Sequence, residues 1–355
     1  RADERTIVAD GWGYTDDYHD WTTGPVRDDD GNMYVAIGSD YAQKNRTAPR
    51  TRWRGTVLRI APDGTIEPIA RGMRYPIGIA ADADGHLFVS DQQGVANTFN
   101  EVNHVIPGHF YGVAARDDQD PPEETRPAVQ IPHPWTRSVN GLTFLPADLT
   151  GPWAPFAGHG IGFEYNNRFL MRFTTQEVNG MLQGASYALT GTEWEDEQQT
   201  FLGPISGAVG PDGQLYVGSI HDSGWLGGQN TGEIVRLRPD GSPLPNGIRE
   251  VRATPDGFEM EFVRPVDRET AADAASYQIS GYTRVWEGSY ATPDSGRYQP
   301  RIGRVSLSAD GRVVRLSVDD LREAYVYELT VSARSADGSK LAPETAHYTM
   351  NSVPR

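Results

Sequence analysis

Side chains that can transfer protons or bind ions recur at similar places along the first part of the chain. A histidine supplies a base whose ordinary pKa lies near neutrality. Arginine guanidinium groups bind anionic oxygens in a fork-like geometry, whereas carboxylate, amide and main-chain oxygens suit a hard cation such as Ca²⁺. The candidate residues of these types are His19, Arg74, Asp91, Gln93, Gly94, Arg137 and Asn140.

A repeated sequence motif, called the phrase below, predicts the strands and turns that position these residues. It consists of a glycine, a few apolar residues, Asp-Gly and an apolar strand, and it occurs at 24–35, 78–89 and 207–217, with a degenerate copy at 141–163. Asp-Gly supports a tight hairpin because glycine readily adopts a positive φ. A third strand follows each pair, so four units in series predict a β-propeller. The candidates precede a first strand or follow a second strand, where propeller loops surround a central funnel.

The pattern changes after residue 245. Alternating strands separated by turn signals such as Asp256-Gly257 and Asp310-Gly311 continue to the end of the chain. They predict a β-sandwich of immunoglobulin or fibronectin type III character. We therefore expect a propeller domain over 1–245 and a sandwich over 246–355, with one short helix near 267–275. Because such sandwiches usually brace a neighbour or present a surface, we expect the chemistry in the propeller.

Composition excludes several classes of function. The net charge of −16 repels phosphate backbones, so no nucleic-acid partner is expected. The absence of cysteine excludes disulfides, thiolate metal sites, a cysteine nucleophile and a covalently attached haem. No apolar run approaches the roughly 18 residues that a membrane helix needs, so no membrane span is expected. Acidity without cysteine suits a bacterial periplasmic or extracellular protein.

Several segments resemble the glucose/sorbosone dehydrogenase-like six-bladed propellers. Residues 18–26 resemble the histidine-bearing blade of that family, and 55–60 resemble its G-K-I-L-R-I segment. Residues 72–78 are similar to its G-x-R-N-P-x-G motif, and 101–112 to its D-E-V-N-x-I-x-x-G-x-N-Y-G motif. A propeller followed by a sandwich also resembles the large proteins described as membrane-bound dehydrogenases in planctomycetes and verrucomicrobia.

The resemblance implies oxidation of a sugar or polyol by pyrroloquinoline quinone (PQQ) bound in the funnel beside Ca²⁺. Electrons would leave through a separate cytochrome or another acceptor, because a cysteine-free chain carries no c-type haem. By motif position, the resemblance makes His19 the base, Arg74 the guanidinium that binds quinone oxygens, and Gln93-Gly94 the loop that approaches the quinone and calcium. Arg137 and Asn140 are added as cofactor-binding residues because we expect them at the funnel, and Asp91 joins Gln93 and Gly94 as an expected calcium ligand because it offers hard oxygens. The expected catalytic residues are therefore His19 and Arg74.

Two other functions stay open at this point. A metal-assisted lyase or hydrolase acting on a uronate would hold its metal with histidines from separate units, while Arg74 or Arg137 neutralises the substrate carboxylate. If three histidine ring nitrogens lay within metal-bond distance of one point, the lyase or hydrolase would be favoured. A non-catalytic carbohydrate-binding propeller is the second alternative, because fold alone does not determine function. The candidate metal ligands are His19, His133, His159 and His221.

The number of blades raises a further expectation. Four repeats occupy the chain ahead of the sandwich, whereas the ring of the family it resembles has six blades. We expect the remaining blades to come from an N-terminal fragment that completes the propeller, either missing from this chain or supplied by another one.

Overall fold

The computed structural model describes residues 3–13, 21–39, 52–94, 96–114, 120–133, 135–191, 201–238, 240–288 and 290–355. Within these ranges the strands form five antiparallel sheets, which confirms the all-β prediction. The helical elements are short: η1 (Gly151–Phe156), α2 (Arg268–Ala272) and η2 (Ala274–Ser276). The α2 helix lies where a helix is predicted, and it begins after Asp267, whose carboxylate accepts a hydrogen bond from the Thr270 amide at 2.9 Å.

Blades one and two each contain four strands in sequential order. Blade one consists of β1 (Thr22–Arg27), β2 (Met33–Ile37), β3 (Thr56–Ile60) and β4 (Ile66–Arg71). Blade two consists of β5 (Pro76–Ala81), β6 (Leu87–Asp91), β7 (Asn100–His104) and β8 (Val129–Ile131). The predicted turns are confirmed, because Gly31 and Gly85 have φ angles of 85° and 83°.

Blades three and four follow the same plan. Blade three consists of β9 (Val139–Phe144), β10 (Gly160–Glu164), β11 (Phe169–Val178) and β12 (Met181–Ala188). In blade four the described strands are β13 (Pro204–Val209), β14 (Leu215–His221) and β15 (Thr231–Leu237). The turn between β13 and β14 contains Gly213 with a φ of 71°, as the Asp-Gly signal predicts.

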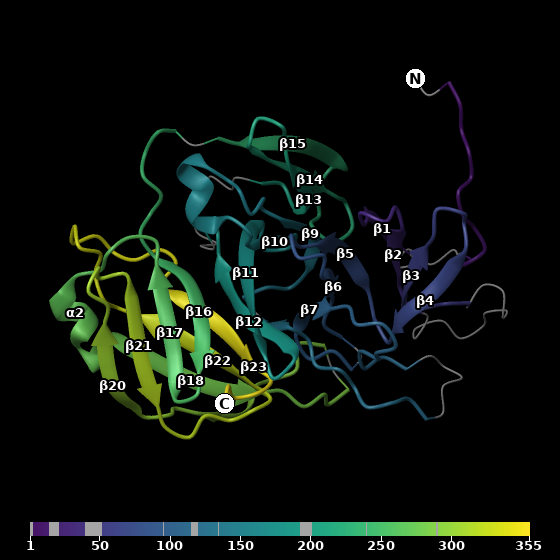
Figure 1. The fold of residues 1–355 in the computed structure, drawn as a ribbon. Helices are drawn as coiled ribbons and strands as arrows, with labels where there is room; N and C mark the ends of the chain where they lie inside the picture. Colours follow the sequence, from purple (N-terminus) through teal and green to yellow (C-terminus); the bar gives the residue numbers. More distant parts are fainter. Residues whose placement is uncertain are drawn as a thin grey trace.

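The first strands of successive blades lie side by side, as in a β-propeller (Figure 1). Strand β1 contacts β5, β5 contacts β9, and β9 contacts β13. The repeated glycine at the start of each phrase permits this approach. A Cβ atom on Gly78 would lie 2.5 Å from the Asn140 main-chain oxygen, and one on Gly141 would lie 2.4 Å from that of Ile205. These glycines are therefore explained by close packing between blades.

Apolar cores fill the spaces between the blades. Val57 of blade one packs in one cluster with Val89 of blade two, which holds the first pair of blades together. Phe88 of blade two and Phe173 of blade three share the next cluster. Further clusters join blade three to blade four and fill the sandwich. Because this burial is spread along the series, removal of apolar surface from water stabilises each blade through its neighbours.

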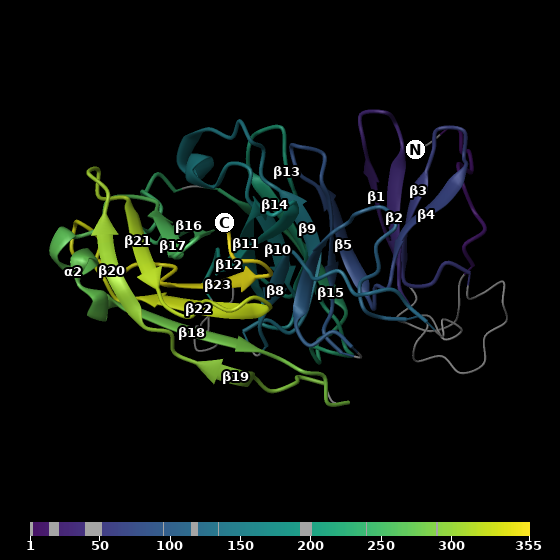
Figure 2. The same cartoon turned by 60° about the horizontal axis from the view of Figure 1, so that its bottom comes forward.

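The C-terminal sandwich shares a sheet with the propeller. One of its sheets contains β16 (Ile248–Thr254), β17 (Gly257–Phe262), β21 (Val313–Val318) and β20 (Ile302–Leu307). The other contains β19 (Ser295–Tyr298), β18 (Tyr277–Thr283), β22 (Tyr325–Val331) and β23 (Thr345–Met350), and β23 pairs with β12 of blade three. The result is one eight-stranded sheet running from β19 to β9 (Figure 2). The expected boundary at 245 therefore separates two parts of the chain that hydrogen bonds join into one sheet.

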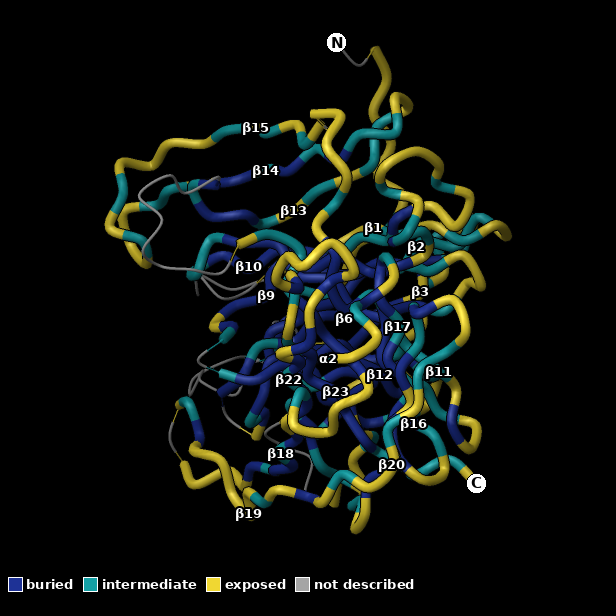
Figure 3. The backbone as a smooth tube through the Cα atoms, turned by 90° about the vertical axis from the view of Figure 1, so that its left-hand side faces the viewer, coloured by how far each residue is buried: buried dark blue, intermediate teal, exposed yellow. Residues whose placement is uncertain are grey.

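Blade four has one face open to solvent (Figure 3). Ile220 of β14 is 36% exposed and Ile234 of β15 is 78% exposed, although both lie on a sheet. The outer face of blade one is covered differently, because Ala9 and Trp12 pack against the cluster that contains Leu58. No helix in the described ranges combines the length and apolarity that a bilayer crossing requires.

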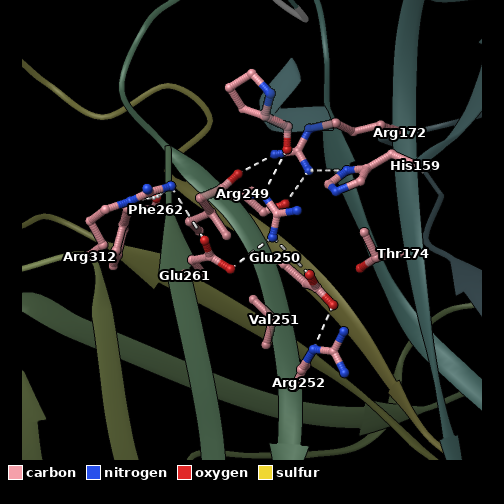
Figure 4. Close-up of polar contacts among 12 residues, drawn as sticks. His159, Arg172, Thr174, Arg249, Glu250, Val251, Arg252, Glu261, Phe262 and Arg312 are labelled. Carbon is pink, nitrogen blue, oxygen red and sulfur yellow. Dashed lines mark hydrogen bonds and ion pairs between the residues drawn. The ribbon is translucent and has the colours of Figure 1, made fainter. Parts of the chain in front are cut away.

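A buried arginine joins blade three to the first strand of the sandwich (Figure 4). Arg172 of β11 has no exposed surface, and its guanidinium donates to the main-chain oxygens of Ile248 and Arg249. It also lies 4.5 Å from the ring centre of Phe156 and 4.3 Å from that of Tyr187. Burial lowers the pKa of Arg172 to about 10, so it stays charged at neutral pH.

Candidate functional site

The structure brings five of the predicted site residues together at the mouth of blade two. We use this term for the edge formed by residues just before β5 and just after β6. Arg74 and Asp91 flank this edge, Gln93 and Gly94 continue from it, and Asn140 lies on the adjoining β9 strand. His19, the predicted base, lies outside the described residues.

The carboxylate of Asp91 links the residues at the mouth of blade two by hydrogen bonds. It is 1% exposed and accepts hydrogen bonds from the main-chain amides of Arg74 and Tyr75, both at 2.6 Å. The Gln92 amide donates at 2.9 Å and the Asn97 side chain at 3.0 Å. Burial nevertheless raises the pKa of Asp91 above its usual value, against the effect of these hydrogen bonds and of the Arg74 charge.

Four donors thus occupy the carboxylate of Asp91, two on each oxygen. An ionised carboxylate offers about four acceptor positions in total. Ligation of Ca²⁺ by Asp91 would therefore compete with bonds that hold β5 to β6. The structure gives this residue a structural role, and its role as a calcium ligand stays a prediction.

Gln93 is buried without partners for its amide. Its side chain is 1% exposed, and neither the amide oxygen nor the amide nitrogen has a hydrogen-bond partner among the described residues. Its main-chain amide donates to the Asn100 side chain at 3.2 Å, which fixes the position of the backbone. A buried, unpaired amide is unusual in folded proteins and points to an interaction that these residues do not supply.

The guanidinium of Arg74 packs directly on Gly94. A Cβ atom on Gly94 would lie 2.3 Å from Arg74 Cζ, so no other residue fits at this position without moving the arginine. Gly94 also has a φ of 152°, which side-chain-bearing residues rarely adopt. Arg74 lies 4.5 Å from the ring centre of Tyr75. The guanidinium is therefore held between the loop that follows Gln93 and an aromatic ring.

Asn140 links the mouths of blades two and three. Its side-chain oxygen accepts from the Ser138 hydroxyl at 2.8 Å and from the Gln92 amide at 3.4 Å. Gln92 also donates to the Ser138 hydroxyl, and Ser90 donates to the Asn140 main-chain oxygen at 2.7 Å. These contacts place Asn140 beside the predicted loop, although they use its side-chain oxygen within the protein.

Arg137 lies one blade away and its side chain is exposed. Its main-chain amide donates to Glu164 at 2.8 Å, and the Ser138 amide donates to the same carboxylate oxygen at 2.7 Å. Burial raises the pKa of Glu164 to about 7, against these main-chain hydrogen bonds. Glu164 thus repeats in blade three the role that Asp91 has in blade two.

The sequence interpretation overlooked this recurring carboxylate. Asp91 ends β6, Glu164 ends β10, and Asp222 follows β14 directly. Asp222 accepts hydrogen bonds from the amides of Gly224 and Trp225 at 2.9 and 2.8 Å. An acid at the end of the second strand in blades two, three and four is a signal that the sequence contains. It indicates a carboxylate that ties loop amides to the strand.

The histidines of the lyase alternative are dispersed. No group of three metal-ligating side chains within the described ranges contains His133, His159 or His221. His159 contacts Arg172 with a nitrogen–nitrogen distance of 3.3 Å, and burial lowers its pKa to about 2. His221 lies 3.3 Å from Arg168. These three histidines therefore do not form the predicted metal site.

One cluster of potential metal ligands does occur in the described part of the chain, at the turn between β5 and β6. It contains Asp82, Asp84 and His86. Asp82 accepts hydrogen bonds from the amides of Asp84 and His86 at 3.0 and 2.8 Å and lies 2.9 Å from the His86 ring. The cluster is explained by the hydrogen bonds of the turn itself.

Several solved structures are similar to this chain at low identity. One is described as the putative oxidoreductase (glucose dehydrogenase) from Thermus thermophilus, with 22% identity, a TM-score of 0.41, and coverage of 59% of this chain and 63% of that one. The soluble aldose sugar dehydrogenase from Escherichia coli shows 14% identity, a TM-score of 0.44 and coverage of 61% and 63%. The PQQ-bound aldose sugar dehydrogenase from Streptomyces coelicolor shows 18% identity and a TM-score of 0.40, with coverage of 58% of this chain and 57% of that one.

The chain spans about three fifths of the length of each of these structures. No curated protein matches it. Residues 1–223, more than half of the chain, match the model of a family described as a domain of unknown function, DUF7133. The chain therefore belongs to the DUF7133 family.

Proposed function

We propose that this chain is a quinone-dependent oxidoreductase of the PQQ type that oxidises a sugar or polyol. The observation that carries the proposal is the amide of Gln93, which is buried and unpaired among the described residues and directly precedes Gly94, on which the guanidinium of Arg74 packs. An unsatisfied buried polar group costs about 1–3 kcal/mol. A ligand that hydrogen-bonds to this amide would recover that free energy, which favours a polar molecule at the mouth of blade two.

The residues at this mouth fit an anionic quinone. Arg74 presents a guanidinium that can bind quinone or carboxylate oxygens, and the Gln93 amide offers one donor group and one acceptor. The exposed side chain of Arg137 supplies a second positive charge from blade three. When bound, PQQ supplies the oxidant that accepts the hydride from the carbon bearing the substrate hydroxyl. The protein binds and orients the reactants.

His19 is proposed as the base that takes the hydroxyl proton. An imidazole is suited to this step because its ordinary pKa lies near neutral pH. For Ca²⁺, we propose the main-chain oxygen of Gly94 and the side-chain oxygen of Gln93 as ligands, both hard oxygen donors. Asp91 would then support the loop through its hydrogen bonds to the main chain.

Three further features belong to the same proposal. Electrons would pass to a separate cytochrome or another acceptor. The protein would work in the periplasm or outside the cell, which its acidic, cysteine-free composition suits. An N-terminal fragment would complete the propeller, and the exposed Ile220 and Ile234 on the open face of blade four support this last feature.

Reconstitution tests the proposal directly. The full chain would be incubated with PQQ and Ca²⁺, and dye reduction would be followed over a panel of aldoses, ketoses and polyols. We expect His19→Ala to lower kcat by about 100-fold or more while the affinity for PQQ stays unchanged. His86→Ala, in the turn between β5 and β6, is the matched control and should keep full activity. Failure of the intact protein to bind PQQ in the presence of Ca²⁺ would contradict the proposal.

A further inference from the structure

The segment between β18 and β19 of the sandwich reaches the mouths of blades two and three. Arg284, which follows β18, has a side chain only 4% exposed. Its guanidinium donates to the main-chain oxygen of Thr98 at 3.3 Å and to that of His133 at 2.6 Å. Thr98 follows Asn97, whose side chain binds Asp91. Figures 1 and 2 show this segment extending from the sandwich toward the loops of the propeller.

Several contacts fix the segment in place. Arg284 pairs with Asp294 at 2.9 Å, which ties the two ends of the segment together. The same guanidinium lies 4.4 Å from the ring centre of Phe99 in blade two. Tyr282 packs against that ring with a centroid distance of 6.2 Å. These contacts tie Arg284, and through it Asp294, to the residues that precede β7 and follow β8 of blade two.

Apolar side chains are exposed on this anchored segment. Val285 is 62% exposed, Trp286 is 43% exposed and Tyr290 is 47% exposed. Nine large apolar side chains are exposed in the described part of the protein, and three of them fall on this short stretch. Single exposed apolar residues are common, whereas a cluster on one loop indicates a binding surface.

The anchor of the segment also contacts a residue near a predicted site residue. Arg284 donates to the main-chain oxygen of His133 at 2.6 Å. His133 precedes the exposed Arg137 by four residues, on the stretch that leads to the mouth of blade three. Aromatic side chains beside exposed hydrogen-bonding groups suit a ligand with apolar faces and polar edges.

We propose that Val285, Trp286 and Tyr290 form a rim that binds sugar rings of a neutral oligosaccharide at the mouth of the propeller. The ring faces would stack on the aromatic side chains while Arg137 contacts hydroxyl groups. This inference deepens the proposed function, since it assigns units of the substrate beyond the one that is oxidised. The rim lies outside residues 1–223, which match the family model.

The net charge of the chain and the small size of the rim both favour a neutral oligosaccharide as its ligand. A net charge of −16 disfavours polyanionic polysaccharides and nucleic acids, whereas neutral sugars experience no such repulsion. Three side chains on one loop form a small surface, and stable protein interfaces bury roughly 1,200–2,000 Å² in total. A sugar chain needs only a few stacked rings and hydrogen bonds. The surface therefore suits a neutral oligosaccharide better than a second copy of this chain.

Calorimetric titration of the full chain, without PQQ, with maltohexaose and separately with cellohexaose tests the rim. We expect wild-type protein to bind at least one hexasaccharide, and Trp286→Ala combined with Tyr290→Ala to weaken that binding tenfold or more. Trp286→Phe should retain most of the affinity, because it keeps an aromatic face. Ile234→Ala, an exposed apolar residue on blade four, is the matched control and should leave binding unchanged.

The possible outcomes separate the rim from the proposed chemistry. Loss of hexasaccharide binding in the double variant, with an unchanged melting temperature, supports the rim even if the protein never oxidises a sugar. Equal affinity of wild type and double variant, or no hexasaccharide binding by wild type, overturns it. Concentration-dependent self-association that disappears in the double variant would identify a second copy as the occupant and would also overturn it.

Discussion

The guanidinium of Arg172 donates a hydrogen bond to the main-chain oxygen of Ile248, which joins blade three to the first strand of the sandwich. A second bond reaches the main-chain oxygen of Arg249, while Phe156 and Tyr187 cover the faces of the guanidinium. A buried charge is costly unless such partners compensate for lost hydration. This arrangement makes the junction between propeller and sandwich a fixed part of the fold.

Replacement of Arg172 should destabilise the whole chain. Arg172→Ala removes two hydrogen bonds, leaves main-chain oxygens buried without donors and opens a cavity between Phe156 and Tyr187. We expect the free energy of unfolding to fall by about 3 kcal/mol or more, as measured by urea denaturation. Arg301→Ala is the control, because the Arg301 side chain is 81% exposed and pairs with Asp319 on the surface. That change should cost less than about 0.5 kcal/mol. Equal losses in both variants would contradict a structural role of the buried arginine.

Replacement of Gln93 should stabilise the cofactor-free protein but weaken its binding of PQQ. Gln93→Leu removes two polar atoms that lack partners among the described residues, so the free energy of unfolding should rise by about 1 kcal/mol. The same change should weaken PQQ binding by about tenfold or more, because the amide is a proposed cofactor ligand. Thermal unfolding of the cofactor-free protein and titration with PQQ provide the two measurements.

Gln183 offers the matched control for that experiment. It is equally buried, but its amide donates to Tyr348 and Ser352 at 2.9 Å and accepts from the Ser352 amide at 2.8 Å. Gln183→Leu should therefore destabilise the protein by about 1–3 kcal/mol and leave PQQ binding unchanged. If both glutamine variants lose stability alike, Gln93 has a partner in the folded protein and the argument for a ligand fails.

Gly94 should tolerate no side chain. In Gly94→Ala the new Cβ would lie 2.3 Å from Arg74 Cζ, so the guanidinium must move away from the mouth of blade two. We expect the affinity for PQQ to fall by about tenfold or more, measured by fluorescence titration. Gly180→Ala is the control, because its φ is 83° and no atom lies within 4 Å of the position that its new methyl group would take. It should cost about 1 kcal/mol of backbone strain without changing binding, and a matching loss of affinity there would refute the steric explanation.

The buried carboxyl of Glu164 should make stability depend on pH. Burial raises its pKa from 4.5 to about 7 in the folded protein, so the folded state holds the proton more tightly than the unfolded chain. The stabilisation from this group is fully present below pH 4.5 and is lost as the pH rises through about 7. The loss is on the order of 3 kcal/mol.

Urea denaturation at pH 5 and pH 8 measures this dependence. Glu164→Gln carries no titrating group at this position, so its free energy of unfolding should fall less between the two pH values than that of wild type. Asp91 and Glu101 also have pKa values raised by burial, but they are common to both proteins and cancel in the comparison. Identical changes with pH in wild type and variant would show that Glu164 does not titrate in this range.

Part of the candidate site could be predicted from the sequence. Arg74, Gln93 and Gly94 occupy motif positions and Asp91 belongs to the loop predicted after the second strand, and the structure places them side by side because β5 and β6 form a hairpin around Gly85. Their individual roles could not be predicted in the same way. Whether Asp91 faces a cation or four amide donors depends on how the loop from Gln92 to Asn97 folds back on it. That arrangement involves contacts between strands and loops that no local pattern specifies.

The sequence by itself determined the succession of hairpins along the chain, and with it the series of blades followed by the sandwich. Alternating apolar residues and Asp-Gly turns act over a few neighbouring residues, so each hairpin can be recognised wherever it occurs. The pairing of β12 with β23, the burial of Arg172 at Ile248 and the docking of Arg284 on Thr98 and His133 were decided only by tertiary structure. These contacts join residues far apart in the chain, and they form only when packing brings two otherwise unrelated surfaces within hydrogen-bonding distance.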